Sequence, residues 1–342
     1  MRKISPHNLL IIVLLASLVL AACAQTATPL LPTQLPAEPT SLPEPTATAP
    51  EPTATSAPTQ EPEPIQIALN DAMGATITLQ APAQRIVSLA PANTEILYAI
   101  GAGQQVVGRD QFSDFPEEAQ QASDIGDITN LNTELIVTLK PDLVLASALT
   151  SPEQVQALQD LGLIVFTMPN PTDLEGMYES LRIVAQLSGH EAEAEALIEA
   201  LQTRVAAVDE KVAGVQERPL VFYELDATDP NAVWTPGPGT YIDQLITRAG
   251  GENLGGVLGS DWAQISLEEL VSKDPDLILL GDAQWGGVTS EAVAARPGWQ
   301  TLSAVMEGKI YPFDDNLVSR PGPRLVDGLE ALAKFLHPEL FE

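Results

Sequence analysis

The sequence predicts an α/β protein built from two similar lobes, each with a parallel sheet, that are joined by one long helix. Three observations predict this architecture. Strand-like and helical segments alternate over most of the chain, which is the order typical of parallel α/β sheets. A short helix-then-strand segment occurs twice, and a long stretch without Pro or Gly lies between the two copies.

The N-terminus has the pattern of an export signal. Two basic residues precede a nearly unbroken apolar run from Leu9 to Leu20. This run is shorter than the roughly 20 residues that span hydrocarbon, which disfavours a transmembrane helix. The following Leu20-Ala21-Ala22-Cys23 resembles the lipobox of bacterial lipoproteins. The resemblance implies a signal peptide over 1–22 and lipidation of Cys23, so that acyl chains anchor the protein to a membrane.

A segment unable to form a core follows the anchor. Residues 26–64 contain 11 of the 29 prolines, nine threonines and no aromatic residue. This composition predicts a disordered, extended tether over 23–64, of a length that suits reaching a neighbour in the same membrane. An O-glycosylated stalk is the alternative interpretation.

The charge balance is strongly acidic, with 16 Lys and Arg against 46 Asp and Glu and a net charge of −30. Such a surface repels phosphate backbones and anionic headgroups, which excludes nucleic-acid binding and attachment through a basic patch. Because Cys23 is the only cysteine, an intramolecular disulfide and a cysteine-ligated zinc site are excluded. The hydrophobic fraction of 45% is still sufficient for a core.

The folded part begins with a predicted hairpin over 65–79, with its turn at 71–74. Further strand-like runs follow, each separated from the next by a helical stretch. They are Ile86–Leu89, Leu143–Ala146, Ile164–Phe166, Leu220–Tyr223, Leu277–Leu280 and Ile310–Tyr311. We predict an N-terminal lobe over 65–188 and a C-terminal lobe over 215–342.

A bridging helix is predicted over 189–214. Residues 190–213 lack Pro and Gly, and apolar residues recur along them at spacings of three and four. These residues are Leu197, Leu201, Val205, Val208 and Val212. One helix of this length measures about 36 Å, the breadth of a domain. A helix over 173–187 leads into it, broken at Ser188-Gly189. An ordinary crossover helix packed on one sheet is the alternative.

The internal repeat aligns Glu134–Leu145 with Glu268–Leu279 without a gap. Each copy predicts a short helix, ended by a proline, and then a buried strand. Glu134 and Glu268 stand in the first turns of the two helices. Interaction with the helix dipole explains either glutamate alone, and matched placement on two lobes also fits a two-pronged contact with a partner.

Sequence motifs for catalysis are absent. There is no phosphate-binding loop, no dinucleotide fingerprint and no nucleophile elbow. His190 and His337 are predicted to be solvated. They are too few, and lie in elements of too different a kind, to form a histidine-rich metal site. We therefore predict no catalytic residues, no metal site and no enzyme.

Several segments together closely resemble the class III periplasmic binding proteins, which are substrate-binding components of ABC importers for cobalamin, ferric siderophores and haem. They are Arg85–Leu97, Gly101–Gly103, Val106–Gly108, Phe112–Pro116, Asn132–Leu145, Trp234–Gly237, Ala249–Asn253, Trp262 with Glu268, and Arg320–Arg324. The match covers residues 80–340. It implies two Rossmann-like lobes bridged by one long helix, an extracytoplasmic location, and permease and ATPase partners.

The resemblance also implies the site. Ligand lies between the lobes in this family, and residues 90–94 follow a strand and open a helix, where open α/β sheets bind ligands. The candidate ligand-binding residues are Pro91, Ala92, Asn93, Phe112, Trp234, Trp262, Asp315 and Arg320, with Phe115 as a further cleft aromatic. Glu134 and Glu268 are the implied permease-docking residues, and the protein is expected to be a monomer.

The ligand that the resemblance favours is a corrinoid such as cobalamin, since the pattern from Ser88 to Pro116 is most similar to cobalamin-binding members. A ferric siderophore or haem bound by the same fold is the alternative. A surface scaffold lipoprotein that takes no part in transport, or an enzyme on the same lobes, is the alternative of another class.

Overall fold

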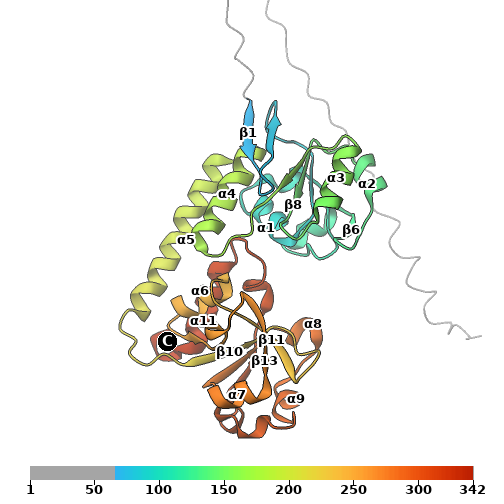
Figure 1. Cartoon of the computed structure of the whole chain (residues 1–342). Coiled ribbons are helices and arrows are strands. Elements are labelled where there is room, and N and C mark those ends of the chain that lie inside the picture. The colour runs from blue at the N-terminus through green and yellow to red at the C-terminus, as the bar shows by residue number, and fades with distance from the viewer. Residues whose placement is uncertain (1–65, 342) are drawn as a thin grey trace, which may run out of the picture. The chain divides into compact units, whose positions relative to one another are not determined.

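The computed structural model describes residues 66–341, so the predicted signal peptide, Cys23 and the tether lie outside it. The described residues form two α/β lobes connected by the long helix α5, Glu191–Val212 (Figure 1). The predicted fold class is thus confirmed. Within residues 66–341, no helix is both long and apolar enough to cross a membrane.

The N-terminal lobe is a five-stranded parallel sheet with helices around it. The strand order is β5 (Ser123–Asp124), β4 (Val106–Arg109), β3 (Ile86–Ser88), β8 (Leu143–Ala146), β9 (Val165–Thr167). Its helices are α1 (Pro91–Ala99), α2 (Thr133–Thr138), α3 (Pro152–Asp160) and α4 (Leu174–Ser188). Two small antiparallel pairs complete it: β1 (Ile67–Asn70) with β2 (Thr76–Leu79), the predicted hairpin, and β6 (Gly126–Asp127) with β7 (Asn130–Leu131).

The C-terminal lobe repeats this plan with four parallel strands. Their order is β12 (Glu252–Asn253), β10 (Leu220–Glu224), β14 (Leu277–Leu280), β15 (Ile310–Pro312). Its helices are α6 (Tyr241–Arg248), α7 (Leu267–Lys273), α8 (Ala283–Gly286), α9 (Ser290–Ala294), α10 (Ser303–Met306) and α11 (Leu325–Leu336).

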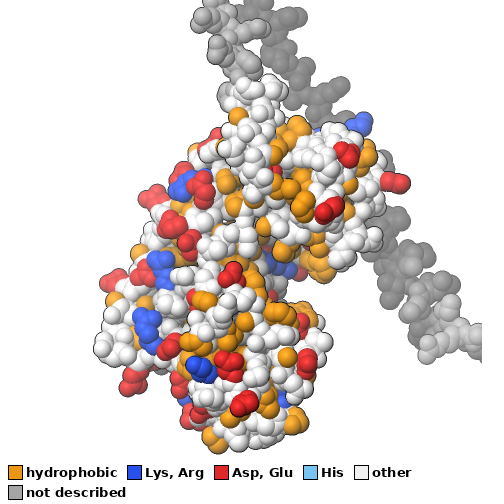
Figure 2. Space-filling model, in the orientation of Figure 1, with side chains coloured by type: hydrophobic (Ala, Val, Ile, Leu, Met, Phe, Trp, Pro, Cys, Tyr) orange, Lys and Arg blue, Asp and Glu red, His pale blue; other side chains and the backbone are white. Residues whose placement is uncertain are grey.

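Short 3-10 helices occur in both lobes. They occupy Ala102–Gln105, Glu117–Gln121, Leu254–Val257, Trp299–Thr301, Asp315–Leu317 and Pro338–Leu340. Figure 2 shows more acidic than basic side chains on one face of the molecule, in keeping with the net charge.

The long helix α5 packs against α4 of the first lobe and α11 of the second. Its buried face consists of Ala194, Ile198, Leu201, Val205, Val208 and Val212, whereas the predicted Leu197 is only half-buried. Gly189, in the left-handed conformation at φ +80, ends α4 and turns the chain into α5.

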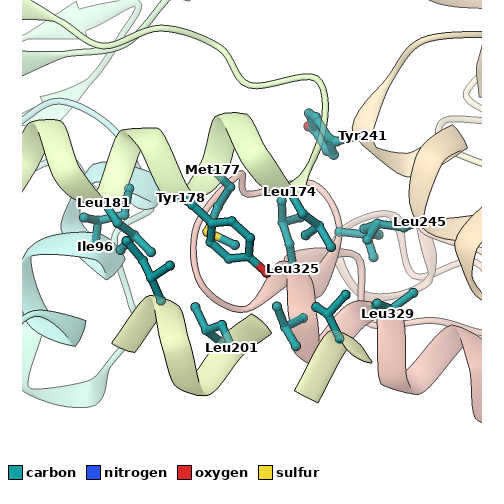
Figure 3. Close-up of a cluster of buried hydrophobic side chains, with 14 of the residues drawn as sticks. Ile96, Leu174, Met177, Tyr178, Leu181, Leu201, Tyr241, Leu245, Leu325 and Leu329 are labelled. Atoms are coloured by element: carbon teal, nitrogen blue, oxygen red, sulfur yellow. The ribbon is translucent and has the colours of Figure 1, made fainter. Parts of the chain in front are cut away.

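One hydrophobic cluster runs through both lobes. Figure 3 shows side chains of α4, among them Tyr178 and Leu174, between Ile96 of α1 and Leu325 of α11. All of these side chains are at most 5% exposed. Because interiors are close-packed, a continuous core of this kind resists movement of one lobe against the other.

The structure confirms the internal repeat in detail. Asn132 and Ser266 cap α2 and α7 by accepting the backbone N–H three residues on. Lys140 and Asp274, at equivalent positions after these helices, both take left-handed conformations, with φ of 49 and 47. Equivalent segments of the two copies therefore have equivalent backbones.

The antiparallel ribbon of β11 (Ala232–Pro236) and β13 (Trp262–Ser266) was not predicted from the sequence. Gly237 follows β11 and donates its N–H to Asp261 O at 2.6 Å. A Cβ at this position would lie 1.8 Å from Ser260 O, so only glycine allows the two chains to approach this closely.

His337 was predicted to be solvated, and this is wrong. The side chain is buried at the end of α11, with Nε2 3.2 Å from Gly250 O. Gly250 has a φ of +90, and a Cβ there would meet the imidazole ring. The packing of α11 against the α6–β12 turn, which local sequence does not reveal, buries this ring.

A buried acidic pair lies in the second lobe. Glu224, at the end of β10, is fully buried and binds Arg296 with both oxygens, at 2.5 and 2.8 Å. Asp282 follows β14, accepts the N–H of Ala227, and leaves its other oxygen without a hydrogen-bond partner. Burial, and next the charge of Glu224, raise the pKa of Asp282 to about 7.

This pair predicts a pH dependence of stability. Since the pKa of Asp282 is about 7 in the folded state against an ordinary 3.8, the folded protein holds a proton that the unfolded chain releases. The contribution of Asp282 to the free energy of unfolding should therefore fall as pH rises from about 4 to 8, by about 4 kcal/mol in all. Urea unfolding of Asp282→Asn across this range should show a smaller slope than the wild type, and equal slopes would contradict the assignment.

Candidate functional site

The first wall of the site is built at the carboxyl ends of β3 and β8. Ala90 is extended, and Pro91 opens α1 with a φ that suits a first helical position. Asn93 is buried and donates from Nδ2 to Leu145 O and Ala146 O, both at 3.2 Å, which ties α1 to the end of β8. This position of residues 90–94 was predicted from the sequence.

A chain of buried hydroxyl groups holds the loop that carries Phe112. Thr94 Oγ1 lies 2.8 Å from both Ser88 Oγ and Ser113 Oγ, and Ser113 donates to the carboxylate of Asp110. The other carboxylate oxygen of Asp110 accepts the N–H of Phe112 at 2.9 Å. The backbone is thereby fixed while the ring of Phe112 projects outward, 57% exposed.

The second wall comes from the C-terminal lobe. Trp262 begins β13, and its ring meets Tyr241 edge-on, with centroids 6.2 Å apart. Tyr241 donates its hydroxyl to Ser319 O at 3.0 Å, which joins α6 to the loop over 316–321. Burial, and next the charge of Asp315, raise the pKa of Tyr241, so this hydroxyl stays protonated.

These walls enclose a cavity of about 460 Å³ between the lobes. The N-terminal lobe contributes residues that follow the four strands β3, β4, β8 and β9, together with one residue of α4, and the C-terminal lobe contributes six residues. The lining residues are Ala90–Asn93, Ile96, Phe112, Ser147–Leu149, Met168–Pro171, Ser180, Tyr241, Trp262, Asn316 and Ser319–Pro321. Most are apolar or small, and Arg320 is the only charged one among the described residues.

A cluster of ion pairs next to the cavity joins the two lobes. Glu95 of α1 is 2% exposed and contacts Arg320 and Arg324 of the other lobe. Arg324 donates to both oxygens of Glu95, at 2.5 and 2.8 Å, and its guanidinium lies 4.1 Å from the centre of the Phe115 ring. Two arginines thus share one buried carboxylate.

The structure brings together six of the eight predicted ligand-binding residues. Pro91, Ala92, Asn93, Phe112, Trp262 and Arg320 all line the cavity. Asp315 lies outside the lining and accepts a hydrogen bond from Tyr223 at 2.7 Å. Burial raises the pKa of its carboxyl.

Trp234 also lies off the cavity, because of its position in the ribbon. It pairs with Gln264, whereas Trp262 pairs with Pro236, two residues further along. Two residues along a strand correspond to roughly 7 Å, and only the Trp262 end of the ribbon reaches the cavity. Phe115 does not line the cavity either, since its ring lies against Arg324.

Sequence reasoning missed the loops over 147–149 and 168–171, together with Tyr241 and Glu95. The two loops follow predicted strands, so the rule that placed residues 90–94 would have found them. No local signal identifies Glu95, because its partners are 225 and 229 residues away.

Comparison with known proteins agrees with this geometry. The family model described as "Periplasmic binding protein" matches residues 86–317. The chain belongs to the periplasmic binding protein family. Family membership confirms the predicted function, which is substrate binding.

Relatives of this periplasmic binding protein include a lipoprotein and a cobalamin-binding protein. The ABC transporter substrate-binding lipoprotein YvrC of Bacillus subtilis is 32% identical, over 83% of this chain and 89% of that protein. A cobalamin-binding protein of Halobacterium salinarum is 30% identical, over 78% of this chain and 73% of its own length.

Solved structures of proteins that are named for different ligands share this fold. The haem-binding protein RhuT of Roseiflexus sp. RS-1 superposes with a TM-score of 0.68 at 27% identity, over 75% of this chain and 99% of that chain. The vitamin B12-binding protein BtuF of Vibrio cholerae superposes with a TM-score of 0.64 at 26% identity, over 76% and 99%.

Proposed function

We propose that this protein is the lipid-anchored, extracytoplasmic substrate-binding component of an ABC importer and that its cavity takes a corrinoid. The observation that carries the choice of ligand is the charge of the cavity wall. Arg320 is the only charged lining residue of the described chain, and its guanidinium contacts two carboxylates, those of Glu95 and Asp114.

A neutral wall disfavours ferric siderophores. Many of these chelates are anionic and need a cation that is free to pair with them, because a buried unpaired charge is costly. With Arg320 already paired, a siderophore gains no counter-charge in this cavity. A corrinoid whose rim carries neutral amides meets no such penalty.

Haem iron needs an axial ligand from the protein, and the side chains that line this cavity are poorly suited to that role. Haem iron is usually held by His, Cys, Met or Tyr. None of the lining residues in the described chain is His or Cys, and the hydroxyl of Tyr241 is committed to Ser319 O. Met168 supplies the one thioether and is 2% exposed. A cobalamin brings both axial ligands of its cobalt with it.

The aromatic rings that line the cavity favour binding of a flat macrocycle. Phe112 projects from the N-terminal lobe and Trp262 from the C-terminal lobe, and both line the cavity while staying 57% and 38% exposed. Exposed rings at the mouth of an apolar cavity lose water contact when a flat ligand covers them, which favours binding.

The remaining assignments extend the family resemblance to this chain. Cys23 carries the lipid, the segment over 23–64 is a tether, and the relative YvrC, named as a lipoprotein, supports an extracytoplasmic location. The protein works as a monomer that passes its ligand to a permease driven by an ATPase. Glu134 and Glu268, both exposed in first turns of equivalent helices, dock on the permease.

A binding panel tests the ligand. Cyanocobalamin, haemin and ferric siderophores are titrated against the purified protein by tryptophan fluorescence, with Trp262 as the reporter on the wall. We expect one-to-one binding of cyanocobalamin, at least about tenfold tighter than haemin, and recovery of the corrinoid unchanged. Tighter binding of haemin would contradict the corrinoid assignment, and conversion of the ligand would indicate an enzyme. No binding across the panel would contradict the cavity as the ligand site.

A further inference from the structure

Arg320, the charged residue of the cavity wall, forms ion pairs with two carboxylates of the opposite lobe. Arg320 Nη1 lies 3.2 Å from Glu95 Oε1 and 2.7 Å from Asp114 Oδ1. Its side chain is 14% exposed and lines the cavity. Any charged group of a ligand at this wall therefore meets the field of Arg320 together with the fields of both carboxylates.

The two carboxylates differ in burial. The side chain of Glu95 is 1% exposed, whereas that of Asp114 is 59% exposed. Water and salt screen an exposed charge strongly and a buried one much less. Of the two carboxylates on Arg320, Glu95 is therefore the one whose charge is screened less, although it also pairs with Arg324 and is not itself among the lining residues.

Glu95 is also held rigidly behind the wall. Arg324 donates Nε to Oε2 and Nη2 to Oε1 of Glu95. Gly322 lies between the two arginines, and a Cβ there would be 3.6 Å from both Glu95 Oε2 and Ala92 O. The loop over 320–324 therefore lies next to α1, and the two hydrogen bonds from Arg324 hold the carboxylate of Glu95 beside Arg320.

We propose that Glu95 is the specificity-determining residue that sets the charge class of the ligand, by cancelling the field of Arg320 from behind the cavity wall. It acts through Arg320 without touching the ligand. With Glu95 charged, the wall accepts neutral macrocycles and gives anionic ones no advantage. The inference rests on the proposed function only in placing the ligand in this cavity.

A matched pair of ligands measures the charge preference directly. Cyanocobalamin is compared with its monocarboxylic acid derivatives, in which a carboxylate replaces one peripheral amide, using the full-length protein in mild detergent. The ratio of the two dissociation constants is the readout, because a purely structural defect weakens both ligands alike. We expect the wild type to prefer the neutral form.

Two substitutions should move this ratio in opposite directions. Glu95→Gln keeps the shape and removes the charge, so the ratio should shift about tenfold or more toward the acid. Arg320→Gln leaves Glu95 in place and should shift the ratio toward the neutral form. The double variant Glu95→Gln/Arg320→Gln should return close to the wild-type ratio.

Asp114→Asn is the matched control, since it removes a carboxylate from the same atom of Arg320 at an exposed position. Its ratio should change less than about threefold. A cooperatively melting Glu95→Gln variant with the wild-type ratio would overturn the proposal. If that variant does not fold, an unchanged ratio in Arg320→Gln would overturn it instead.

The test also separates this inference from the proposed ligand. If the wild type binds no corrinoid, the corrinoid assignment fails, and the same variants are then compared with haemin and its dimethyl ester, which differ by two carboxylates. Opposite shifts of that ratio in the two variants would still support the role of Glu95. Unchanged ratios would overturn it.

Discussion

Replacing both Glu134 and Glu268 with Arg is expected to abolish delivery of the ligand through the permease. The two glutamates are exposed in the first turns of α2 and α7, whose caps and following left-handed residues are equivalent in the two lobes. A roughly two-fold symmetric partner needs equivalent charges on equivalent elements, and charged rim pairs act on encounter and register. Uptake in reconstituted vesicles and stimulated ATP hydrolysis should fall by roughly 100-fold or more.

Ligand affinity and melting temperature should stay at wild-type values, because neither glutamate lines the cavity. Each single substitution should cause a partial loss that deepens with salt. A matched control is Glu153→Arg/Glu291→Arg, which makes the same charge change at exposed first-turn positions of α3 and α9. Normal transport by the Glu134→Arg/Glu268→Arg variant would show that these residues only stabilise their helices.

Replacing Trp262 with Ala is expected to weaken ligand binding by about 1–3 kcal/mol, or roughly 5- to 150-fold. The ring lines the cavity, is 38% exposed without ligand, and packs edge-on against Tyr241. Covering it with a flat ligand removes apolar surface from water, and the alanine variant forfeits that gain. Calorimetric titration measures the loss.

Trp234→Ala provides an unusually close control. Trp234 lies in the same two-stranded ribbon and is 39% exposed, but it does not line the cavity. Both variants should melt within a few degrees of the wild type, and only Trp262→Ala should lose affinity. Equal losses in the two variants would indicate that the ribbon acts as a whole and that Trp262 is no ligand contact.

The sequence by itself determined the features that arise from local patterns. Apolar spacing predicted α5, because a helix needs a regular buried face. The aligned copies at Glu134 and Glu268 predicted two equivalent helix–strand units, because caps and turns depend on a few neighbouring residues. The position of residues 90–94 at the end of β3 followed from the order of strand and helix.

The tertiary structure alone decided which of these residues meet. The sequence alone does not reveal which of Trp234 and Trp262 lines the cavity. The register of the ribbon places only Trp262 there. Glu95 appears in the sequence as an ordinary helical acid. Docking of the two lobes buries it against Arg320 and Arg324, more than 200 residues away. Such pairings depend on how whole elements pack, and packing between distant segments leaves no periodic trace in the local sequence.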